Sequence, residues 1–176
     1  MQVILAINPG STSTKLALLT QDQIIVQETI SHEVEDLAKF DSILSQLPYR
    51  EQMVQLWLDM HLKDDTIAAV VGRGGMLKPL HSGVYRVNEA MKQDLRAGTY
   101  GLHASNLGGL LADAIASKFG VNSYIVDPVS VDEFAEVARI SGLPELPRAS
   151  MLHALNIRAT VRSEEHTSEL QSPYVI

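Results

Sequence analysis

The stretch QVILAINPGSTSTKLALL, residues 2–19, decides the fold. Its first part, 2–8, is a short apolar run that predicts a buried strand. Residues 8–14 have the composition of a turn, and residues 16–19 are apolar again. After a second turn, the alternation over 24–30 predicts a third strand. We therefore expect an antiparallel meander of three strands at the N-terminus.

Downstream of this meander, helical and strand patterns alternate. Apolar residues recur every three or four positions from about residue 35 to 63, and Pro48 is expected to divide that segment into two helices. Buried strands are expected at 67–71, buried on both sides, and at 124–126. Helices are expected at 89–95, capped by Asn88, at 105–119, ended by Gly120, and at 150–161. This order predicts an α/β fold with a mixed sheet and helices on both faces.

Composition narrows the possible functions. The chain has 176 residues, 45% of them hydrophobic, and a formal net charge of −7. The acidic balance argues against nucleic acid or an anionic membrane as partner, because both reward clusters of Lys and Arg. With no cysteine, a disulfide scaffold, a thiolate zinc site and a cysteine nucleophile are excluded. No run resembles a signal sequence or a membrane span, so a cytoplasmic location is the expectation.

The C-terminal tail differs in kind from the rest. The segment RSEEHTSELQS, residues 162–172, has no apolar period that continues the preceding helix. It is similar to the in-frame translation of a common sequencing-library adapter; a natural polar extension is the alternative. On the first interpretation, residues 162–176 are non-native, and the protein would continue beyond Val161.

The turn from Asn8 to Lys15 is the first candidate site. It is not a Walker A loop, since a strand follows it and the glycine before the lysine is missing. Gly10 would let the backbone approach an anion, while successive N–H groups and the hydroxyls of Ser11, Thr12 and Ser13 would donate to it. Asn8 could reach a metal-bound water. An ordinary polar hairpin turn is the alternative.

Two further candidates directly follow expected buried strands, where ligands bind in open α/β sheets. In Gly72-Arg73-Gly74-Gly75, the glycines would clear room for a guanidinium that grips a carboxylate or phosphate. Asp127 is well placed to hold Mg²⁺ or to orient an arginine. The alternative for Arg73 is a solvated arginine in a flexible loop. The alternative for Asp127 is an aspartate in the turn that ends a strand.

Two histidines complete the candidates. His103 precedes a helix start where Ser105 or Asn106 could cap. Glycines in that first turn suggest a close approach of another backbone or of an anion. His153 begins the last helix, and a packed or capping role is the alternative for it. No Gly-x-Ser-x-Gly motif accompanies it, which argues against a serine-hydrolase triad.

Taken in order, these motifs resemble those of the butyrate kinase branch of the acetate kinase family, within the sugar-kinase and actin superfamily. The resemblance rests on NPGSTSTK (8–15), VVGRGG (70–75), HASNLGG (103–109), IVDPV (125–129) and HALN (153–156). Acetate kinases prefer serines where this chain has Pro9 and Thr12, so the butyrate branch fits better. Branched-chain, acetate and propionate kinases remain alternatives, as does a non-catalytic module that binds phosphate or nucleotide.

The resemblance implies reversible transfer of a phosphoryl group from ATP to a short-chain carboxylate, with Mg²⁺ as cofactor. It also implies a ribonuclease H-like, actin-like fold of two domains with the active site between them. Residues 1–161 would be the N-terminal domain, and the second domain would be missing. The complete protein would be a homo-oligomer with a short-chain fatty acid and ATP as partners, and the chain alone would be inactive.

Site roles follow from the same resemblance. Arg73, His153 and Asp127 would be catalytic; Asn8 and Asp127 would hold the metal. The phosphates would lie along Gly10, Ser11, Thr12, Ser13 and Lys15, with His103 as a weaker candidate. Elementary chemistry agrees with these roles, because a carboxylate is already ionised at neutral pH and needs no general base. The obstacle is the repulsion between two anions, which positive charge and N–H donors relieve.

Overall fold

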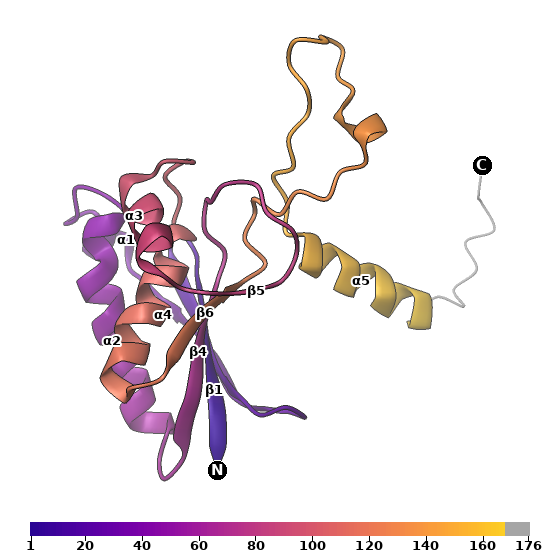
Figure 1. Ribbon diagram of the computed structural model, residues 1–176. Coiled ribbons are helices and arrows are strands. Elements are labelled where there is room, and N and C mark those ends of the chain that lie inside the picture. The colour runs from indigo at the N-terminus through magenta and orange to yellow at the C-terminus, as the bar shows by residue number, and fades with distance from the viewer. Residues whose placement is uncertain (168–176) are drawn as a thin grey trace.

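The computed structural model describes residues 1–167, with side chains to residue 163. One six-stranded sheet, in the order β3-β2-β1-β4-β6-β5, forms its centre (Figure 1). The strands are β1 (Gln2–Pro9), β2 (Ser13–Leu19), β3 (Ile24–Ser31), β4 (Thr66–Arg73), β5 (Val84–Arg86) and β6 (Asn122–Val126). The mixed sheet in an α/β fold is as expected.

The N-terminal meander is confirmed. β1 pairs antiparallel with β2, which pairs antiparallel with β3, and Asn8 faces Lys15 across the first hairpin. β1, β4 and β6 run parallel side by side, so their carboxyl ends meet at one edge of the sheet. β5 was not predicted from the sequence; it is a three-residue edge strand antiparallel to β6.

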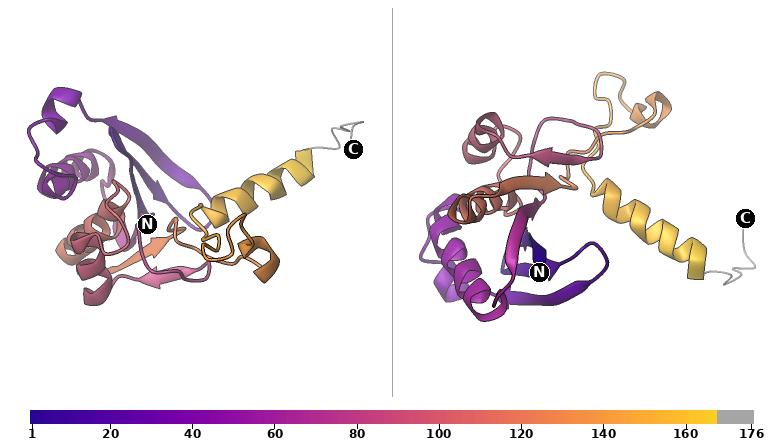
Figure 2. Two further views of the ribbon diagram at one scale, coloured as in Figure 1. Left: turned by 90° about the horizontal axis from the view of Figure 1, so that it is seen from above. Right: turned by 60° about the horizontal axis from the view of Figure 1, so that its bottom comes forward.

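The helices that precede β6 in the chain lie on one side of the sheet (Figures 1 and 2). Of these, α2 and α4 pack against the strands through one continuous apolar core. The core includes Leu5 and Ile7 of β1, Val54 and Trp57 of α2, and Leu111 of α4, all at most 1% exposed. The helices are α1 (Val34–Leu37), α2 (Leu47–His61), α3 (Glu89–Ala97) and α4 (Asn106–Phe119). Short 3₁₀ turns occupy Leu44–Gln46 and Glu136–Arg139.

The segment before α2 corrects one expectation. Instead of a helix that Pro48 ends, the chain forms the single turn α1, then the 3₁₀ turn, and α2 begins at Leu47 with Pro48 in its first turn. Proline suits that position because the first helical N–H groups have no intrahelical partner. The Ser42 N–H donates to the Ser45 hydroxyl and the Ser45 N–H donates to the Ser42 hydroxyl, and this reciprocal pair favours a turn over a continuous helix.

The opposite face of the sheet differs from the expected arrangement. Among the described residues, the helices that pack on the sheet cover one face only, whereas α5 (Ala154–Thr167) extends away from the other side without lying across the strands (Figures 1 and 2). In β4, Ile67 and Val70 are buried under the helices, while Ala69 and Val71 on the other face are half-buried. Expected burial of β4 on both sides is therefore only half realised.

The helices α3 and α4 follow their predicted ranges closely. Asn88 caps α3 by accepting a hydrogen bond from the Met91 N–H at 2.9 Å, and Gly120 ends α4 in the left-handed conformation. The last helix starts at Ala154, four residues later than expected, and its backbone continues past Val161 to Thr167. The rest of the predicted non-native tail, residues 168–176, lies outside the described residues.

Candidate functional site

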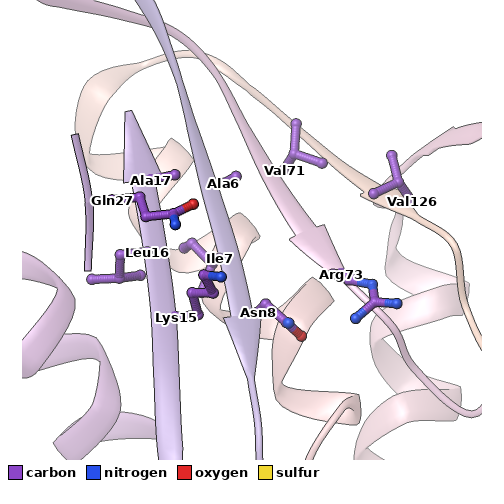
Figure 3. A pocket seen from close by; sticks show the side chains of 10 residues that line it. All are labelled: Ala6, Ile7, Asn8, Lys15, Leu16, Ala17, Gln27, Val71, Arg73 and Val126. Carbon is purple, nitrogen blue, oxygen red and sulfur yellow. The ribbon is translucent and has the colours of Figure 1, made fainter. Parts of the chain in front are cut away.

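Three of the predicted site residues share one shallow pocket at the carboxyl edge of β1 and β4. Asn8, Lys15 and Arg73 line it, and its cavity volume is about 190 Å³ (Figure 3). They meet there because β1 and β4 are parallel neighbours, with Ile7 beside Gly72 in register. Figure 3 shows the Asn8 amide pointing toward the side on which the Arg73 guanidinium lies.

Polar groups in this pocket are free to bind a ligand. Within residues 1–167, no hydrogen bond or ion pair engages the Asn8 amide or the Lys15 ammonium. The Arg73 side chain is 31% exposed and has Asp127 as its charged partner. The Lys15 ammonium and the Asn8 amide are thus unpartnered beside the partly exposed Arg73 guanidinium, and this set attracts an anion.

Asp127 follows β6 and connects three parts of the site. Its Oδ2 accepts a hydrogen bond from Arg73 Nη2 at 3.2 Å, and its Oδ1 accepts one from the Leu155 N–H of α5 at 2.9 Å. The side chain is 6% exposed. Its φ of +48° is one that Asp tolerates better than most residues. The carboxylate therefore orients Arg73 and caps α5 at the same time.

His153 also contacts Asp127. Its Nδ1 is 2.7 Å from the Asp127 carbonyl oxygen and 3.4 Å from Oδ2. The carbonyl can only accept, so Nδ1 carries a proton and donates. The neutral ring then presents a lone pair at Nε2, and the ring can donate from Nε2 only as imidazolium.

The turn between β1 and β2 is exposed and rich in free donors. The Gly10 N–H donates to Ser13 O at 2.8 Å and closes the turn. In the described part of the chain, the hydroxyls of Ser11, Thr12 and Ser13 have no hydrogen-bond partner. Thr14 differs: it is 1% exposed, and its hydroxyl is 2.8 Å from His32 Nε2. The loop thus presents hydroxyls outward and is anchored by Thr14 inward.

The glycines beside Arg73 have a different purpose from the one expected. Gly74 and Gly75 have φ of +94° and +112°, a region that favours glycine. A Cβ on Gly74 would lie 2.7 Å from the Ser105 Cβ. These glycines therefore make the turn and allow close packing against the start of α4, rather than clearing space around the guanidinium.

The packing of Gly108 explains why the first turn of α4 contains a glycine. A Cβ there would lie 2.5 Å from Arg73 O, and a Cβ on Gly72 would lie 2.1 Å from Gly108 O. Of the two expectations, a close backbone rather than an anion accounts for Gly108. The contact also sets the distance between the backbone of Arg73 and α4.

Neither Ser105 nor Asn106 caps α4. The Ser105 hydroxyl is 2.8 Å from His103 Nδ1, and the Asn106 amide bridges outward, accepting from the Met76 N–H and donating to Gly101 O. His103 itself is exposed and does not line the pocket shared by Asn8 and Arg73. Its assignment to phosphate binding stays a prediction.

The donor set fits Mg²⁺ in a limited way. Among the described residues there is no group of three or more His, Asp or Glu side chains able to hold a metal. Mg²⁺ at phosphate sites keeps several waters and needs only one or two protein oxygens, so the unpartnered Asn8 amide suits it. Both Asp127 oxygens already accept hydrogen bonds, which favours orientation of Arg73 over metal binding for that carboxylate.

Sequence reasoning missed Arg50, which is 0% exposed in α2. Its guanidinium donates to carbonyl groups of the Gly10–Ser13 turn. A signal was present in the spacing, because Arg50 lies on the same helical face as the apolar Val54, Trp57 and Leu58. A charged residue on a buried face needs partners, and the nearby turn offers them.

The chain is similar in sequence to known proteins of about twice its length. No family model matches the chain. Butyrate kinase 2 of Clostridium acetobutylicum is 48% identical over 167 residues, which are 94% of this chain and 47% of that protein. The chain therefore spans about half the length of the curated relatives it matches, and its resemblance to butyrate kinases extends over nearly all of its residues.

Solved structures agree on the fold. A propionate kinase from Francisella tularensis superposes with a TM-score of 0.58 at 13% identity, over 96% of this chain and 50% of that one. An acetate kinase from Entamoeba histolytica superposes with a TM-score of 0.59 at 14% identity, over 93% and 47%. The mixed sheet and its helices thus have the ribonuclease H-like, actin-like architecture that the sequence motifs implied.

Proposed function

We propose that this chain is the N-terminal half of an acyl kinase that transfers the γ-phosphoryl group of ATP to a short-chain carboxylate, with butyrate as the preferred acid. The 48% identity to a butyrate kinase supports the reaction class. The observation that carries the proposal is the gathering of Asn8, Lys15 and Arg73 in one pocket at the carboxyl edge of the sheet.

Charge neutralisation is the main task in this reaction. A carboxylate oxygen forms a bond to the γ-phosphorus while the bond to ADP breaks, and both reactants are anions. Arg73 binds the acid or the moving phosphoryl group, and Lys15 lies along the phosphates. Asp127 keeps Arg73 in place, which matters because catalysis here consists of positioning and electrostatic stabilisation.

The remaining residues supply hydrogen bonds. The turn from Gly10 to Ser13 donates to the phosphates, and His153 would donate from Nε2, once protonated there, to charge that develops on the transferred group. Mg²⁺, when bound at Asn8, would neutralise phosphate charge. No base is required, since the acid is ionised at neutral pH.

The decisive test is Arg73→Ala in the protein encoded by the complete reading frame, because the chain spans half of its relatives' length. Acyl phosphate trapped as hydroxamate should fall by roughly 10²–10³-fold, the loss typical of one transition-state donor. Arg96→Ala is the matched control, since Arg96 is exposed on α3. Turnover by Arg73→Ala equal to that of the control would refute the role of Arg73.

The 176-residue chain alone should show no steady turnover, because closure of two lobes completes such sites. Calorimetry with Mg-ATP separates this proposal from a self-sufficient nucleotide-binding module: tight binding by the chain alone would favour the module. The second domain, the homo-oligomeric state and the cytoplasmic location remain predictions. No helix in residues 1–167 is long and apolar enough to cross a bilayer.

A further inference from the structure

The buried side chain of Arg50 binds the backbone of the Gly10–Ser13 turn, which we expect to bind phosphate. Arg50 Nη1 donates to Gly10 O at 2.8 Å and to Ser13 O at 3.0 Å, and Nη2 donates to Ser11 O at 2.9 Å. These acceptors are main-chain carbonyl groups of one exposed turn, reached from α2 across about 40 residues of sequence. The guanidinium therefore fixes the turn's backbone.

The other acceptors around the Arg50 guanidinium are uncharged side-chain oxygens. Gln46 Oε1, one helical turn earlier, accepts from Nε at 3.1 Å and from Nη2 at 2.9 Å, and Thr14 Oγ1 is 3.2 Å from Nη1. Among the described residues, no carboxylate pairs with Arg50. Burial lowers the pKa of this guanidinium from its ordinary value, yet an arginine stays protonated in proteins. An uncompensated positive charge thus lies directly behind the turn.

The direction of the carbonyl groups decides the direction of the N–H groups. In a planar trans peptide the C=O and the following N–H point to opposite sides, and no peptide bond here is cis. With the Gly10 and Ser11 carbonyls held toward Arg50, the N–H groups of Ser11 and Thr12 face away from it. Neither of these N–H groups has a partner within residues 1–167.

We propose that Arg50 is a positioning residue for phosphate binding, which holds the carbonyl groups of the turn behind the backbone so that the Ser11 and Thr12 N–H groups stay available to a phosphoryl group in front. The inference rests on the proposed function, because the phosphoryl group is that of ATP or of the acyl phosphate. Arg50 itself does not touch the ligand; it acts through geometry and through its charge.

Phosphate titration of the isotope-labelled 176-residue chain, followed by amide NMR signals, tests this without any kinase assay. Inorganic phosphate is the probe, and sodium chloride at matched ionic strength is the reference, because screening alone shifts signals unspecifically. Saturable shifts are expected at the Ser11 and Thr12 amides and not at β5.

Arg50→Lys is the main variant, since it keeps the charge and loses the fork that reaches three carbonyl groups. Phosphate affinity should fall about tenfold, as expected for the loss of hydrogen bonds from a charged group. Arg96→Lys, an exposed arginine on α3, is the matched control and should bind as the unaltered chain does. If Arg50→Lys fails to fold, Gln46→Leu replaces it, because it leaves Arg50 without the acceptor that orients it.

A folded Arg50→Lys or Gln46→Leu chain with undiminished phosphate affinity would overturn the inference, and so would phosphate shifts that avoid Ser11 and Thr12. Failure of the proposed function is seen separately, as absent hydroxamate formation by the complete protein. Phosphate binding at the turn that Arg50→Lys weakens, in a protein without kinase activity, would support the role of Arg50 and refute the reaction.

Discussion

At the scale of single residues, the contact between Gly72 and Gly108 sets the distance between sheet and helix beside Arg73. A Cβ at Gly72 would meet the Gly108 carbonyl carbon at 2.4 Å and its oxygen at 2.1 Å. Backbone rather than a flexible side chain is the obstacle, so neither element can give way locally. The position of the guanidinium therefore depends on a residue that has no side chain.

Gly72→Ala should lower the free energy of unfolding by more than about 2 kcal/mol, because overpacking against backbone displaces β4 or α4. Urea denaturation followed by circular dichroism measures it. Gly142→Ala is the matched control: nothing lies within 4 Å of its added Cβ, and a change within about 0.5 kcal/mol is expected. Equal stabilities of the two variants would contradict the close contact.

His32 makes stability depend on pH. Burial, with a contribution from the Arg50 charge, lowers the pKa of His32 from 6.5 to about 4. Between pH 6.5 and 4, His32 is protonated in the unfolded chain and neutral in the folded chain. The free energy of unfolding therefore falls as the pH decreases from 6.5 to 4. The slope should approach about 1.4 kcal/mol per pH unit.

Urea denaturation across that pH range checks this expectation, and His32→Gln should flatten the slope. Carboxylates with lowered pKa values, such as Asp132 and Glu133, act in the same direction at lower pH. Comparing variant and unaltered chain at each pH isolates the histidine. Parallel slopes for the two proteins would show that His32 is not the group responsible.

Single-residue predictions from sequence succeed where the strand order alone decides the outcome. Asn8 and Arg73 lie at the carboxyl ends of the neighbouring parallel strands β1 and β4, so the fold alone brings them together. Arg50 is missed by such reasoning because its partners in the turn are mainly main-chain carbonyl groups, which any residue type can supply. The role of Gly74 was misjudged for a similar reason: its neighbour, Ser105, is distant in sequence.

At the scale of elements, α5 shows how a cap can come from another part of the chain. The Leu155 N–H in its first turn donates to Asp127, 28 residues earlier, at the end of β6. Local sequence suggests a start near residue 150, whereas the helix begins at Ala154. The residue before it, His153, forms a hydrogen bond with the Asp127 carbonyl. Helix boundaries that depend on a distant acceptor cannot be read from neighbouring residues.

Asp127→Ala should destabilise the first turn of α5 by about 1 kcal/mol, the usual loss with a cap. Hydrogen exchange at the Leu155 amide should become about fivefold faster. Asp127→Asn is the matched control, because it retains an oxygen acceptor and tolerates the positive φ while it removes the charge beside Arg73. Exchange at Leu155 that is unchanged in Asp127→Ala would refute the cap.

At the scale of the whole molecule, one side of the sheet has helices and the other has no helix packed across it in the described residues (Figures 1 and 2). Ala69 and Val71 of β4 are half-buried on that open face, and α5 extends from the same side with Ile157 and Val161 about half exposed. The order of strands and helices predicts which elements form. It does not predict what covers each face, because the chain spans only about half the length of its relatives.

Apolar surface left open on this side should make the chain self-associate, since contiguous exposed apolar patches favour burial. Sedimentation velocity over a concentration series should show reversible association. Ile157→Lys on α5 should weaken it by about tenfold, because it places a charge where burial would otherwise occur. Leu56→Lys on α2 is the matched control, as both side chains are 48% exposed but on opposite sides of the sheet. A monomer at every concentration, or equal effects of the two substitutions, would show that the open side is not the surface of association.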